Sequence, residues 1–388
     1  MMQKPKNLYE INTATYLSRL TQTVGSSVTL ATIPDAELQL LATRGIDSVW
    51  FMGVWARSPR GVAITRNNAD LMDEFRTTLP DYCDDDLIGS AYSIHDYHVD
   101  QRFGGDEALM ILRDQLHRLG LKLILDFVPN HTALDHPWIS AHPDYYITGT
   151  TDDITAQPDY FAACGDTIIA NGRDPHYPAW QDTAQVNAFA KSYRHASIET
   201  LSLIATLCDG VRCDMAMLLL NDIFAKTWGQ HAGTVPSTEY WTDIITSTRR
   251  EHPDFVFIAE AYWQTEATLV DQGFDYCYDK TLYDLLLNTP DRVDEYLTSN
   301  LAMTEHMVHF IENHDEQRAA AAFSRARHEA AARRIASLPG LTMWHDGQWQ
   351  GRKIHIPVQL GRCPEEASDT AISDFYDTLL QRDTINTT

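Results

Sequence analysis

Two short segments each place a carboxylate at or just past the end of an apolar, strand-like stretch. They are GVRCDMA, which begins at Gly210 and contains Arg212 and Asp214, and FIAEAYW, which begins at Phe257 and contains Glu260. A parallel strand buried on both faces is expected to be almost entirely apolar, and Arg212 and Asp214 break that pattern on one face. Buried charges are costly unless they are paired or hydrogen-bonded, so we interpret Asp214 as a candidate catalytic carboxylate with an arginine beside it.

Four carboxylates lie at or near the ends of different strand-like stretches: Asp126, Asp214, Glu260 and Asp315. The carboxyl ends of the strands of a parallel barrel meet on one face, so these side chains are expected in one site. Two carboxylates in one pocket suit glycoside hydrolysis, in which one attacks or stabilises the sugar and the other protonates the leaving oxygen. A single such acid is weaker evidence, because an acid at a strand end often caps the following helix. The four together favour a catalytic site.

The neighbours of two of these acids predict different pKa values. Arg212 is expected to keep Asp214 ionised through its opposite charge, as a nucleophile requires. Glu260 is preceded by an apolar run, residues 257–259, and is followed by Tyr262 and Trp263. Apolar surroundings raise the pKa of a carboxyl group, which suits a general acid.

Strand-like runs alternate with amphipathic helical stretches along the whole chain. The predicted strands cover residues 7–12, 46–54, 121–127, 208–214, 255–260, 274–278, 307–312 and 338–343. Helices are predicted between them, for example over residues 106–119, where apolar side chains recur at helical spacing and Gly120 follows the last turn. Strand and helix repeated eight times predict a parallel sheet closed into a (β/α)8 TIM barrel.

Two long segments interrupt the predicted barrel. A bare barrel needs about 250 residues, so much of this chain must be insertion. The longest insertion covers residues 131–186, after the third strand, and another stretch, residues 55–102, follows the second. We predict a catalytic barrel of residues 1–130 and 187–388 with an inserted subdomain of residues 131–186, because a structureless loop of that size is unusual. One loop and one helix, residues 369–381, follow the last strand.

The composition excludes several classes of function. The formal net charge of the 388-residue chain is −24, which repels phosphate backbones and anionic membranes. Neither nucleic acid nor a membrane is therefore expected as a partner. The N-terminal segment MMQKPKNLYE has no apolar signal-peptide core, and the six cysteines form no CxxC pair and no metal-ligand spacing. These features predict a cytoplasmic protein with reduced thiols.

Four segments in order along the chain resemble the α-amylase family of glycoside hydrolases, family thirteen. They are DFVPNH at residues 126–131, GVRCD at residues 210–214, the segment around Glu260, and ENHDEQR at residues 312–318. Each segment alone is a weak match, whereas the ordered set on four predicted strands is specific. The resemblance implies that Asp214 is the nucleophile, Glu260 the acid/base and Asp315 the transition-state stabiliser.

The resemblance also implies a set of sugar-binding residues. Arg212, His131 and His314 are expected to contact the sugar in the cleavage subsite. The segment AYSIHDY, residues 91–97, is similar to the family's segment whose tyrosine stacks on that sugar, which is Tyr92 here. Arg318 completes an HDxxR pattern that resembles α-glucosidases, and we include it among the substrate-binding residues. Asp126 is expected to be structural and to hold the hydrogen-bond network of the site.

The chain departs from the family pattern at three places. Classical α-amylases follow the nucleophile with a Lys-His pair, whereas residues 215–218 are Met-Ala-Met-Leu here, which argues against a standard endo-acting starch amylase. Gly89 stands where α-glucosidases usually have the Asp that pairs with the arginine of the HDxxR pattern. The family's β-rich C-terminal domain is missing, either by natural truncation or because the chain is incomplete.

A structural calcium ion is possible but is not expected to be required. In many family members the Asn of the DxxxNH run binds Ca²⁺, and Asn130 occupies that place; Gln185 stands where a second ligand is usually Asp. A neutral amide in place of a carboxylate weakens a site for a hard cation, although Asp182 is near enough in sequence to compensate. An alternative metal site of three histidines in residues 131–142 with Asp135 does not have the spacing of a metal motif. We therefore predict no metal ligands, no required cofactor, and Asn130 hydrogen-bonded across to the insertion.

The sequence thus predicts a retaining hydrolase of α-glucosidic bonds in α-glucans or α-glucosides, acting through a covalent glycosyl-enzyme intermediate. The expected partner is an oligo- or polysaccharide with such linkages. Transglycosylation is the first alternative, since a sugar hydroxyl can replace water at the same intermediate. A non-catalytic carbohydrate-binding relative is the second, and the intact acids argue against it.

Overall fold

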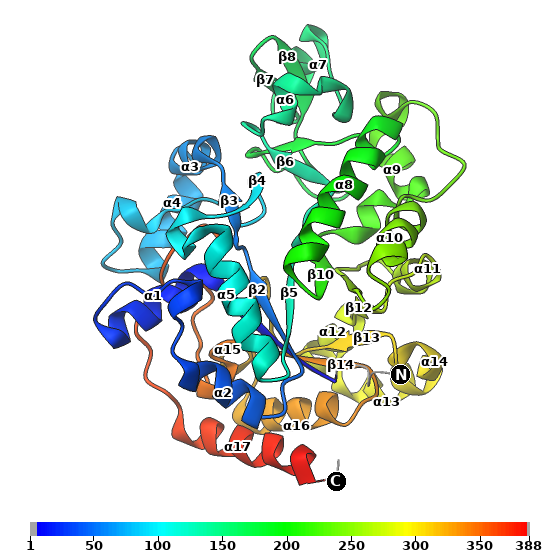
Figure 1. The fold of residues 1–388 in the computed structure, drawn as a ribbon. Helices are drawn as coiled ribbons and strands as arrows, with labels where there is room; N and C mark the ends of the chain where they lie inside the picture. Colours follow the sequence, from blue (N-terminus) through cyan, green and yellow to red (C-terminus); the bar gives the residue numbers. More distant parts are fainter. Residues whose placement is uncertain (1–5, 386–388) are drawn as a thin grey trace.

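Eight parallel strands close into a barrel in the computed structural model, which describes residues 6–385 (Figure 1). In chain order these strands are β1 (Asn7–Asn12), β2 (Ser48–Met52), β5 (Lys122–Phe127), β10 (Gly210–Cys213), β11 (Val256–Ala259), β12 (Tyr276–Tyr278), β13 (Met307–His309) and β14 (Leu341–His345). The order around the barrel is β1-β14-β13-β12-β11-β10-β5-β2, and β1 closes it by pairing with both β14 and β2. The predicted (β/α)8 TIM barrel is confirmed.

All eight predicted strands are present, and most are shorter than predicted. Asp214 and Glu260 were placed inside strands, whereas each lies directly after its strand, at the mouth of the barrel. The last strand was predicted over residues 338–343 and instead begins at Leu341. Pro339 has no backbone N–H to donate to a neighbouring strand, and Gly340 has φ +102°, a left-handed conformation that is incompatible with a strand.

Helices cover the outside of the barrel between successive strands (Figure 1). The longer ones are α1 (Thr13–Val24), α2 (Asp35–Thr43), α5 (Gly105–Arg118), α8 (Lys191–Leu207), α10 (Tyr240–Glu251), α12 (Lys280–Asn288), α16 (Arg325–Ala336) and α17 (Thr370–Ile385). Shorter α-helices and 3-10 helices complete the connections: η1 (Leu30–Thr32), η2 (Asp84–Asp86), η3 (Gln101–Phe103), η5 (Ala216–Leu219), α9 (Asn221–Trp228), η6 (Gly229–Ala232), α11 (Glu266–Asp271), η7 (Pro290–Arg292), α13 (Val293–Ser299), α14 (Leu301–Thr304), α15 (Ala319–Ala322) and η8 (Gln348–Gln350). Within the described part of the chain, no helix is both long enough and apolar enough to cross a membrane.

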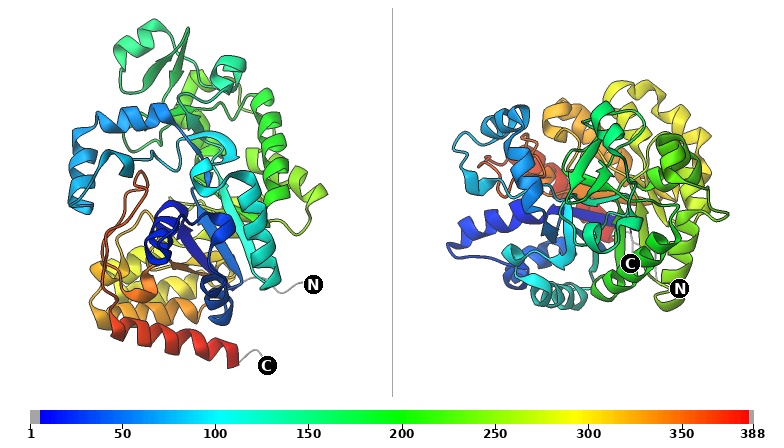
Figure 2. Two further views of the ribbon diagram at one scale, coloured as in Figure 1. Left: turned by 60° about the vertical axis from the view of Figure 1, so that its left-hand side comes forward. Right: turned by 90° about the horizontal axis from the view of Figure 1, so that it is seen from above.

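Two long segments follow barrel strands and carry small elements of their own. The segment after β2 contains β3 (Trp55–Arg57), α3 (Pro59–Arg66), α4 (Ala69–Thr78) and β4 (Ile94–Val99). The segment after β5 contains β6 (His131–Ala133), α6 (Trp138–Ala141), η4 (Pro143–Tyr145), α7 (Thr151–Ala156), β7 (Phe161–Cys164), β8 (Thr167–Ala170) and β9 (Thr183–Gln185). Antiparallel pairing of β6 with β9 brings the two ends of this segment together, and Figure 2 shows it rising at the end of the barrel opposite α17. The domain division at residues 131 and 186 remains a prediction.

Side chains alternate between the inside of the barrel and the layer under the helices. An inner cluster includes Leu8, Trp50, Ile124 and Ile258, whereas Val211 packs in the larger core outside the strands. In the register of the sheet, Arg212 of β10 lies beside Asp126 of β5 and Ile258 of β11. Because alternate residues of a strand face the same side, Arg212 points into the barrel.

Gly210 is needed where β10 passes closest to its neighbours. A Cβ at this position would lie 2.6 Å from the carbonyl oxygen of Val256, 2.8 Å from the Val256 Cβ and 2.9 Å from the Ile124 Cδ1. Two of these three atoms belong to the neighbouring strand β11, which cannot move without disturbing the sheet. The glycine therefore fixes the spacing of the strand that carries Arg212 and leads to Asp214.

We predict that Gly210→Ala destabilises the protein. Forcing a methyl group into a closely packed interior typically costs about 1–3 kcal/mol, so the midpoint of thermal unfolding should fall. Ala267→Ser, at an exposed position of α11, is the matched control and should leave the midpoint unchanged. An unchanged midpoint in Gly210→Ala, measured by circular dichroism, would contradict the close packing described here.

Candidate active site

The predicted carboxylates meet at the mouth of the barrel. Asp126 lies in β5, Asp214 and Glu260 directly follow β10 and β11, and Asp315 lies in the loop after β13. Asp126, Asp214 and Glu260 are buried, whereas the side chain of Asp315 is 45% exposed. All four lie at or near the carboxyl ends of parallel strands of the barrel, where active sites of this fold lie.

The guanidinium of Arg212 connects two of these acids. Its Nη1 donates to Asp214 Oδ1 at 2.7 Å, and its Nη2 lies 2.9 Å from Glu260 Oε2. The side chain of Arg212 is fully buried, and its charge lies over the rings of Trp50, Tyr92 and Tyr278 at 5.3, 5.3 and 5.5 Å. Ring faces and two carboxylates thus surround a cation that water cannot reach.

Burial raises the pKa of both acids that share Arg212. For Glu260, burial raises the pKa to about 7 against the opposing attraction of Arg212. Burial also raises the pKa of Asp214, although Arg212 pulls it down through its charge and a hydrogen bond. Arg212 therefore lowers the pKa of Asp214, as predicted, but burial raises this pKa by more. The two acids face one cation, so they titrate as a pair.

Two further donors hold the carboxylate of Glu260. The backbone N–H of Met215 donates to Oε2 at 2.6 Å, and the hydroxyl of Tyr262 donates to Oε1 at 2.8 Å. Oε2 therefore faces two nitrogens, of Met215 and Arg212, that can only donate. A proton on this acid must sit on Oε1, where the Tyr262 hydroxyl can turn to accept.

His314 lies between two carboxylates. Its Nδ1 is 2.5 Å from Glu10 Oε1, and its Nε2 is 3.1 Å from Asp315 Oδ2 and 2.8 Å from the Tyr92 hydroxyl. Burial lowers the pKa of His314, but Asp315 and Glu10 outweigh burial and hold it well above the usual value. The resulting imidazolium keeps the pKa of Asp315 below its usual range, although burial opposes this.

Glu10 is a site residue that the sequence analysis missed. It is fully buried in β1 and reaches both the ring and the backbone N–H of His314 across 304 positions of the chain. The available signal was a charged residue inside the apolar strand-like segment NLYEIN. The same reasoning that singled out Arg212 applies to it, because an unpaired charge in that place is costly.

Asp126, Tyr92 and His131 support the mouth. Both carboxylate oxygens of Asp126 accept hydrogen bonds, from Trp50 Nε1 at 3.2 Å and from the backbone N–H of Gly53 at 2.6 Å. Burial raises the pKa of Asp126 to about 6 and lowers that of His131 to about 4. Neutral His131 must donate from Nε2 to the Tyr92 carbonyl at 3.1 Å, and the Tyr92 ring stacks on His314 with centroids 5.4 Å apart. This geometry agrees with the structural role expected for Asp126.

His131 and Arg318 were predicted to contact the sugar, and both already form hydrogen bonds within the protein. His131 uses Nε2 for Tyr92, and its Nδ1 lies 3.3 Å from Asn130 Nδ2. Arg318 is buried, forms an ion pair with Glu312 at 3.2 Å and bonds His345 at 2.6 Å. Glu312 is thus the carboxylate that pairs with Arg318 in this chain. Direct sugar contacts by His131 and Arg318 remain predictions.

The residues at the expected calcium position do not fit a cation. Gln185 Nε2 donates to the carbonyl oxygen and the Oδ1 of Asn130, at 2.8 and 3.1 Å. The amide hydrogens therefore occupy the oxygens that a hard cation would need. The predicted contact from Asn130 to the insertion is present. Among residues 6–385, no group of three or more His, Cys, Asp or Glu is arranged to hold a metal ion.

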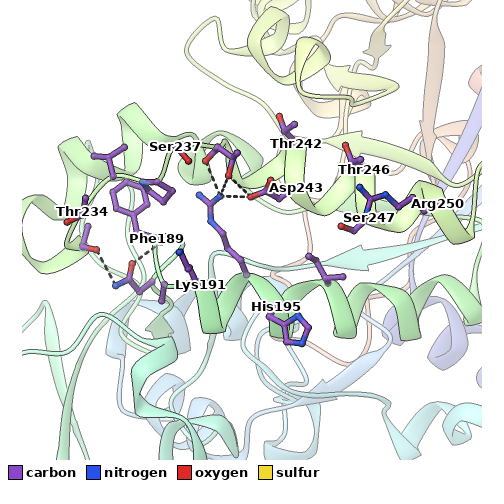
Figure 3. A pocket seen from close by; sticks show the side chains of 18 residues that line it. Phe189, Lys191, His195, Thr234, Ser237, Thr242, Asp243, Thr246, Ser247 and Arg250 are labelled. Atoms are coloured by element: carbon purple, nitrogen blue, oxygen red, sulfur yellow. Dashed lines mark hydrogen bonds and ion pairs between the residues drawn. The ribbon is translucent and has the colours of Figure 1, made fainter.

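A separate cavity of 970 Å³ lies on the outer side of the barrel between α8 and α10 (Figure 3). Its lining includes Lys191, Arg194, Thr242, Asp243 and Arg250. Arg194 is buried there and donates to Asp243 at 2.9 Å. None of the predicted site residues lines this cavity, so the carboxylates at the mouth remain the candidate active site.

Comparisons with known proteins find a family match over most of the chain. The family model described as "Alpha amylase, catalytic domain" matches residues 35–370. Alpha-amylase MalA of Haloarcula japonica is 25% identical over 250 residues, which are 61% of this chain and 33% of that protein. Trehalose synthase/amylase TreS of Mycolicibacterium smegmatis is 33% identical over 223 residues, 52% of this chain and 36% of that protein. The matches thus span about a third of the length of these two relatives.

The fold also has solved counterparts. The crystal structure of an alpha-amylase from Lactobacillus plantarum superposes with a TM-score of 0.69 at 19% sequence identity. The match covers 97% of this chain and 80% of that one. At this level of identity the likeness concerns the barrel and its surrounding elements.

We predict that removing divalent cations leaves the stability of the protein unchanged, because Asn130 and Gln185 satisfy each other. The midpoint of thermal unfolding should be the same with EDTA, with added Ca²⁺ and with neither. Gln185→Ala, which removes the amide contacts to Asn130, should lower the midpoint by an amount corresponding to about 1–3 kcal/mol. A midpoint that drops sharply in EDTA and recovers with Ca²⁺ would contradict the prediction.

Proposed function

The chain belongs to the α-amylase family, and from that premise we propose that it is a retaining glycoside hydrolase of α-glucosidic bonds. The proposed substrates are α-glucans or α-glucosides. One observation carries the proposal: Arg212 binds Asp214 through Nη1 and Glu260 through Nη2, so two acids that share a cation sit on adjacent strand ends. A retaining mechanism needs such a close pair, with one acid as nucleophile and the other as acid/base.

Asp214 is the proposed nucleophile. Its Oδ1 is held by Arg212, which leaves Oδ2 to attack the anomeric carbon. The attack forms a bond from Oδ2 to the anomeric carbon while the bond from that carbon to the leaving oxygen breaks. The permanent charge of Arg212 keeps an ionised form of Asp214 accessible in a site where burial opposes it.

Glu260 is the proposed acid and, in the second step, the base. A proton on Oε1 passes to the glycosidic oxygen as the first bond breaks, and Glu260 is left ionised and stabilised by Met215 N–H, Arg212 and Tyr262. A water molecule then loses a proton to Glu260 and attacks the anomeric carbon, which releases Asp214. The raised pKa of Glu260 suits an acid that works near neutral pH.

Asp315 and His314 are the proposed contacts to the hydroxyls of the reacting sugar. Asp315 is the exposed acid of the mouth, so its carboxylate is free to accept from a sugar, and His314 fixes its position. Hydrogen bonds of this kind that strengthen as the sugar becomes oxocarbenium-like stabilise the transition state. The stacked ring of Tyr92 is the proposed platform for the sugar.

Transglycosylation is the second candidate function. Trehalose synthase/amylase TreS and an α-1,4-glucan:maltose-1-phosphate maltosyltransferase are among the relatives, and a sugar hydroxyl can take the place of water at the same intermediate. A non-catalytic carbohydrate-binding role is disfavoured by the complete set of acids. We also propose a cytoplasmic location, supported by the six cysteines, which are all unpaired.

We predict that Asp214→Asn lowers kcat on α-glucosides by about three orders of magnitude or more, because the covalent route is lost. Glu260→Gln should be as damaging on natural disaccharides but milder on aryl α-glucosides, whose leaving groups need little protonation. Asp254→Asn, at an exposed position just before the start of β11, the strand that Glu260 follows, is the control. NMR should show the product with retained α configuration, and near-wild-type activity of both acid variants would refute the assignment.

A pH dependence follows from the raised pKa of Glu260. The acid must be protonated to act on a natural substrate, so kcat/KM should fall as the pH rises through about 7. It should also fall at low pH, when the nucleophile becomes protonated. The fall in kcat/KM at high pH should be smaller with an aryl glycoside that bears a good leaving group. A profile that stays flat from pH 6 to 9 on disaccharides would argue against Glu260 as the acid.

A further inference from the structure

The cavity between α8 and α10 takes no part in the proposed reaction (Figure 3). α8 leads into β10 and α10 leads into β11, and these two strands pair in parallel, so the helices run side by side in the same direction. Residues 234–238, just before α10, complete the lining. A volume of 970 Å³ is at the upper end of the range of about 300–1,000 Å³ that small-molecule sites occupy. The size therefore suits a small organic ligand.

The lining carries an excess of positive charge, although the chain as a whole has a net charge of −24. Lys191, Arg194 and Arg250 are its cations, and Asp243, 2.9 Å from Arg194, is its carboxylate. The side chains of Lys191 and Arg250 are exposed, and within residues 6–385 neither forms an ion pair or a hydrogen bond. The chain as a whole repels anions, so two available cations on one cavity are a local exception.

The two available cations stand at opposite ends of the cavity. The ion pair between Arg194 and Asp243 sets the alignment of the two helices. Lys191 lies three residues before Arg194 on α8, and Arg250 lies seven residues after Asp243 on α10. With a rise of 1.5 Å per residue, the backbones of the two cations are about 15 Å apart along the helix direction. A ligand that contacts both must be elongated, with an anionic group near each end.

Hydroxyl groups form much of the remaining wall. They belong to Thr234, Ser237, Thr238, Thr242, Thr246 and Ser247. Hydroxyls on a helix can donate to a backbone carbonyl of the preceding turn, as Thr248 of α10 does to Ile244 at 3.0 Å. In the described part of the chain, the hydroxyls of Thr242, Thr246 and Ser247 form no such bond. They are therefore available to the oxygens of a sugar or a phosphate.

We propose that this cavity is a second ligand site, separate from the mouth of the barrel, and that it binds a sugar with a phosphate group at each end. Lys191 and Arg250 each bind one phosphate, and the hydroxyls of α10 donate to oxygens between them. Lys and Arg both bind phosphate, and hydrogen bonds to a charged group are the strong ones. An uncharged sugar leaves both cations without a partner, and a single phosphate leaves one. Binding here does not depend on the proposed reaction.

The test measures the Kd of fructose, fructose 6-phosphate and fructose 1,6-bisphosphate by titration calorimetry. Low ionic strength is needed, because salt screens exposed charges. The second phosphate gains a second cation, so the bisphosphate should bind about tenfold or more tightly than the monophosphate. Fructose should bind more weakly than either phosphate. A monophosphate that binds as tightly as the bisphosphate, or a bisphosphate that does not bind, would overturn the proposal.

Two variants locate the binding. Lys191→Gln and Arg250→Gln each remove one cation, so each should raise the Kd of the bisphosphate to about that of the monophosphate. Lys226→Gln in α9 and Arg118→Gln in α5 are the matched controls, because both residues are exposed and neither lines the cavity; they should leave the Kd unchanged. Equal midpoints of thermal unfolding show that the variants are folded. A wild-type Kd in both Lys191→Gln and Arg250→Gln would place the ligand elsewhere and refute the site.

A third variant separates a specific site from a general attraction of charges. Thr246→Val removes one hydroxyl of the wall and keeps the charge and approximate shape of the cavity. In a specific site the Kd of the bisphosphate should rise about threefold or more, because a hydrogen bond is lost. Charge attraction alone would leave the Kd unchanged, and that result would overturn the proposed role of the hydroxyls and with it the sugar as ligand.

Discussion

Arg212 is a cation that solvent cannot reach, and the geometry of the mouth follows from the need to compensate it. Removing one partner from a buried ion pair typically costs about 3–5 kcal/mol, because the other charge is left unpaired. Asp214 and Glu260 supply the compensation on two edges of the guanidinium, and aromatic rings cover its faces. The contacts that make the charge tolerable are thus the ones that hold two acids next to each other. Stability and the placement of the proposed nucleophile and acid depend on the same side chain.

The barrel supplies the position of this cation. Alternation along β10 turns Arg212 inward, and the register sets it beside Asp126, whose own carboxylate is fixed by the backbone of Gly53. The strand can approach its neighbours this closely because Gly210 has no side chain. A second buried charge, Glu10, is compensated in the same way by His314 from the far end of the chain. Both of these buried charges are therefore matched by a partner from another strand or loop, as the cost of desolvation requires.

Local sequence pattern was sufficient to predict the strands and the acids that follow them, because a charge at the end of an apolar run is visible in the sequence. The last strand shows the limit of that pattern. The predicted strand began at the apolar Leu338, whereas Pro339 and Gly340 prevent strand pairing there and the observed strand begins at Leu341. Contacts between distant segments could not be predicted. Nothing near His314 in the sequence indicates Glu10 as its partner, and nothing near Arg318 distinguishes a sugar contact from the internal pair with Glu312 that the structure has.

The departure from the family pattern after Asp214, the proposed nucleophile, has a physical role in this fold. Residues 216–220 are apolar and buried, and Ala216 is held from both sides: its N–H donates to the Glu260 carbonyl at 3.1 Å and its carbonyl accepts from Trp241 Nε1 at 2.8 Å. Because Ala216 is fixed in this way, Met215 retains its left-handed backbone conformation, and its N–H donates to Glu260 Oε2. A backbone donor has no charge to lose with pH, so the orientation of the acid is preserved in both of its protonation states. The buried run that stands where classical α-amylases have a Lys-His pair thereby determines which oxygen of Glu260 can carry the proton.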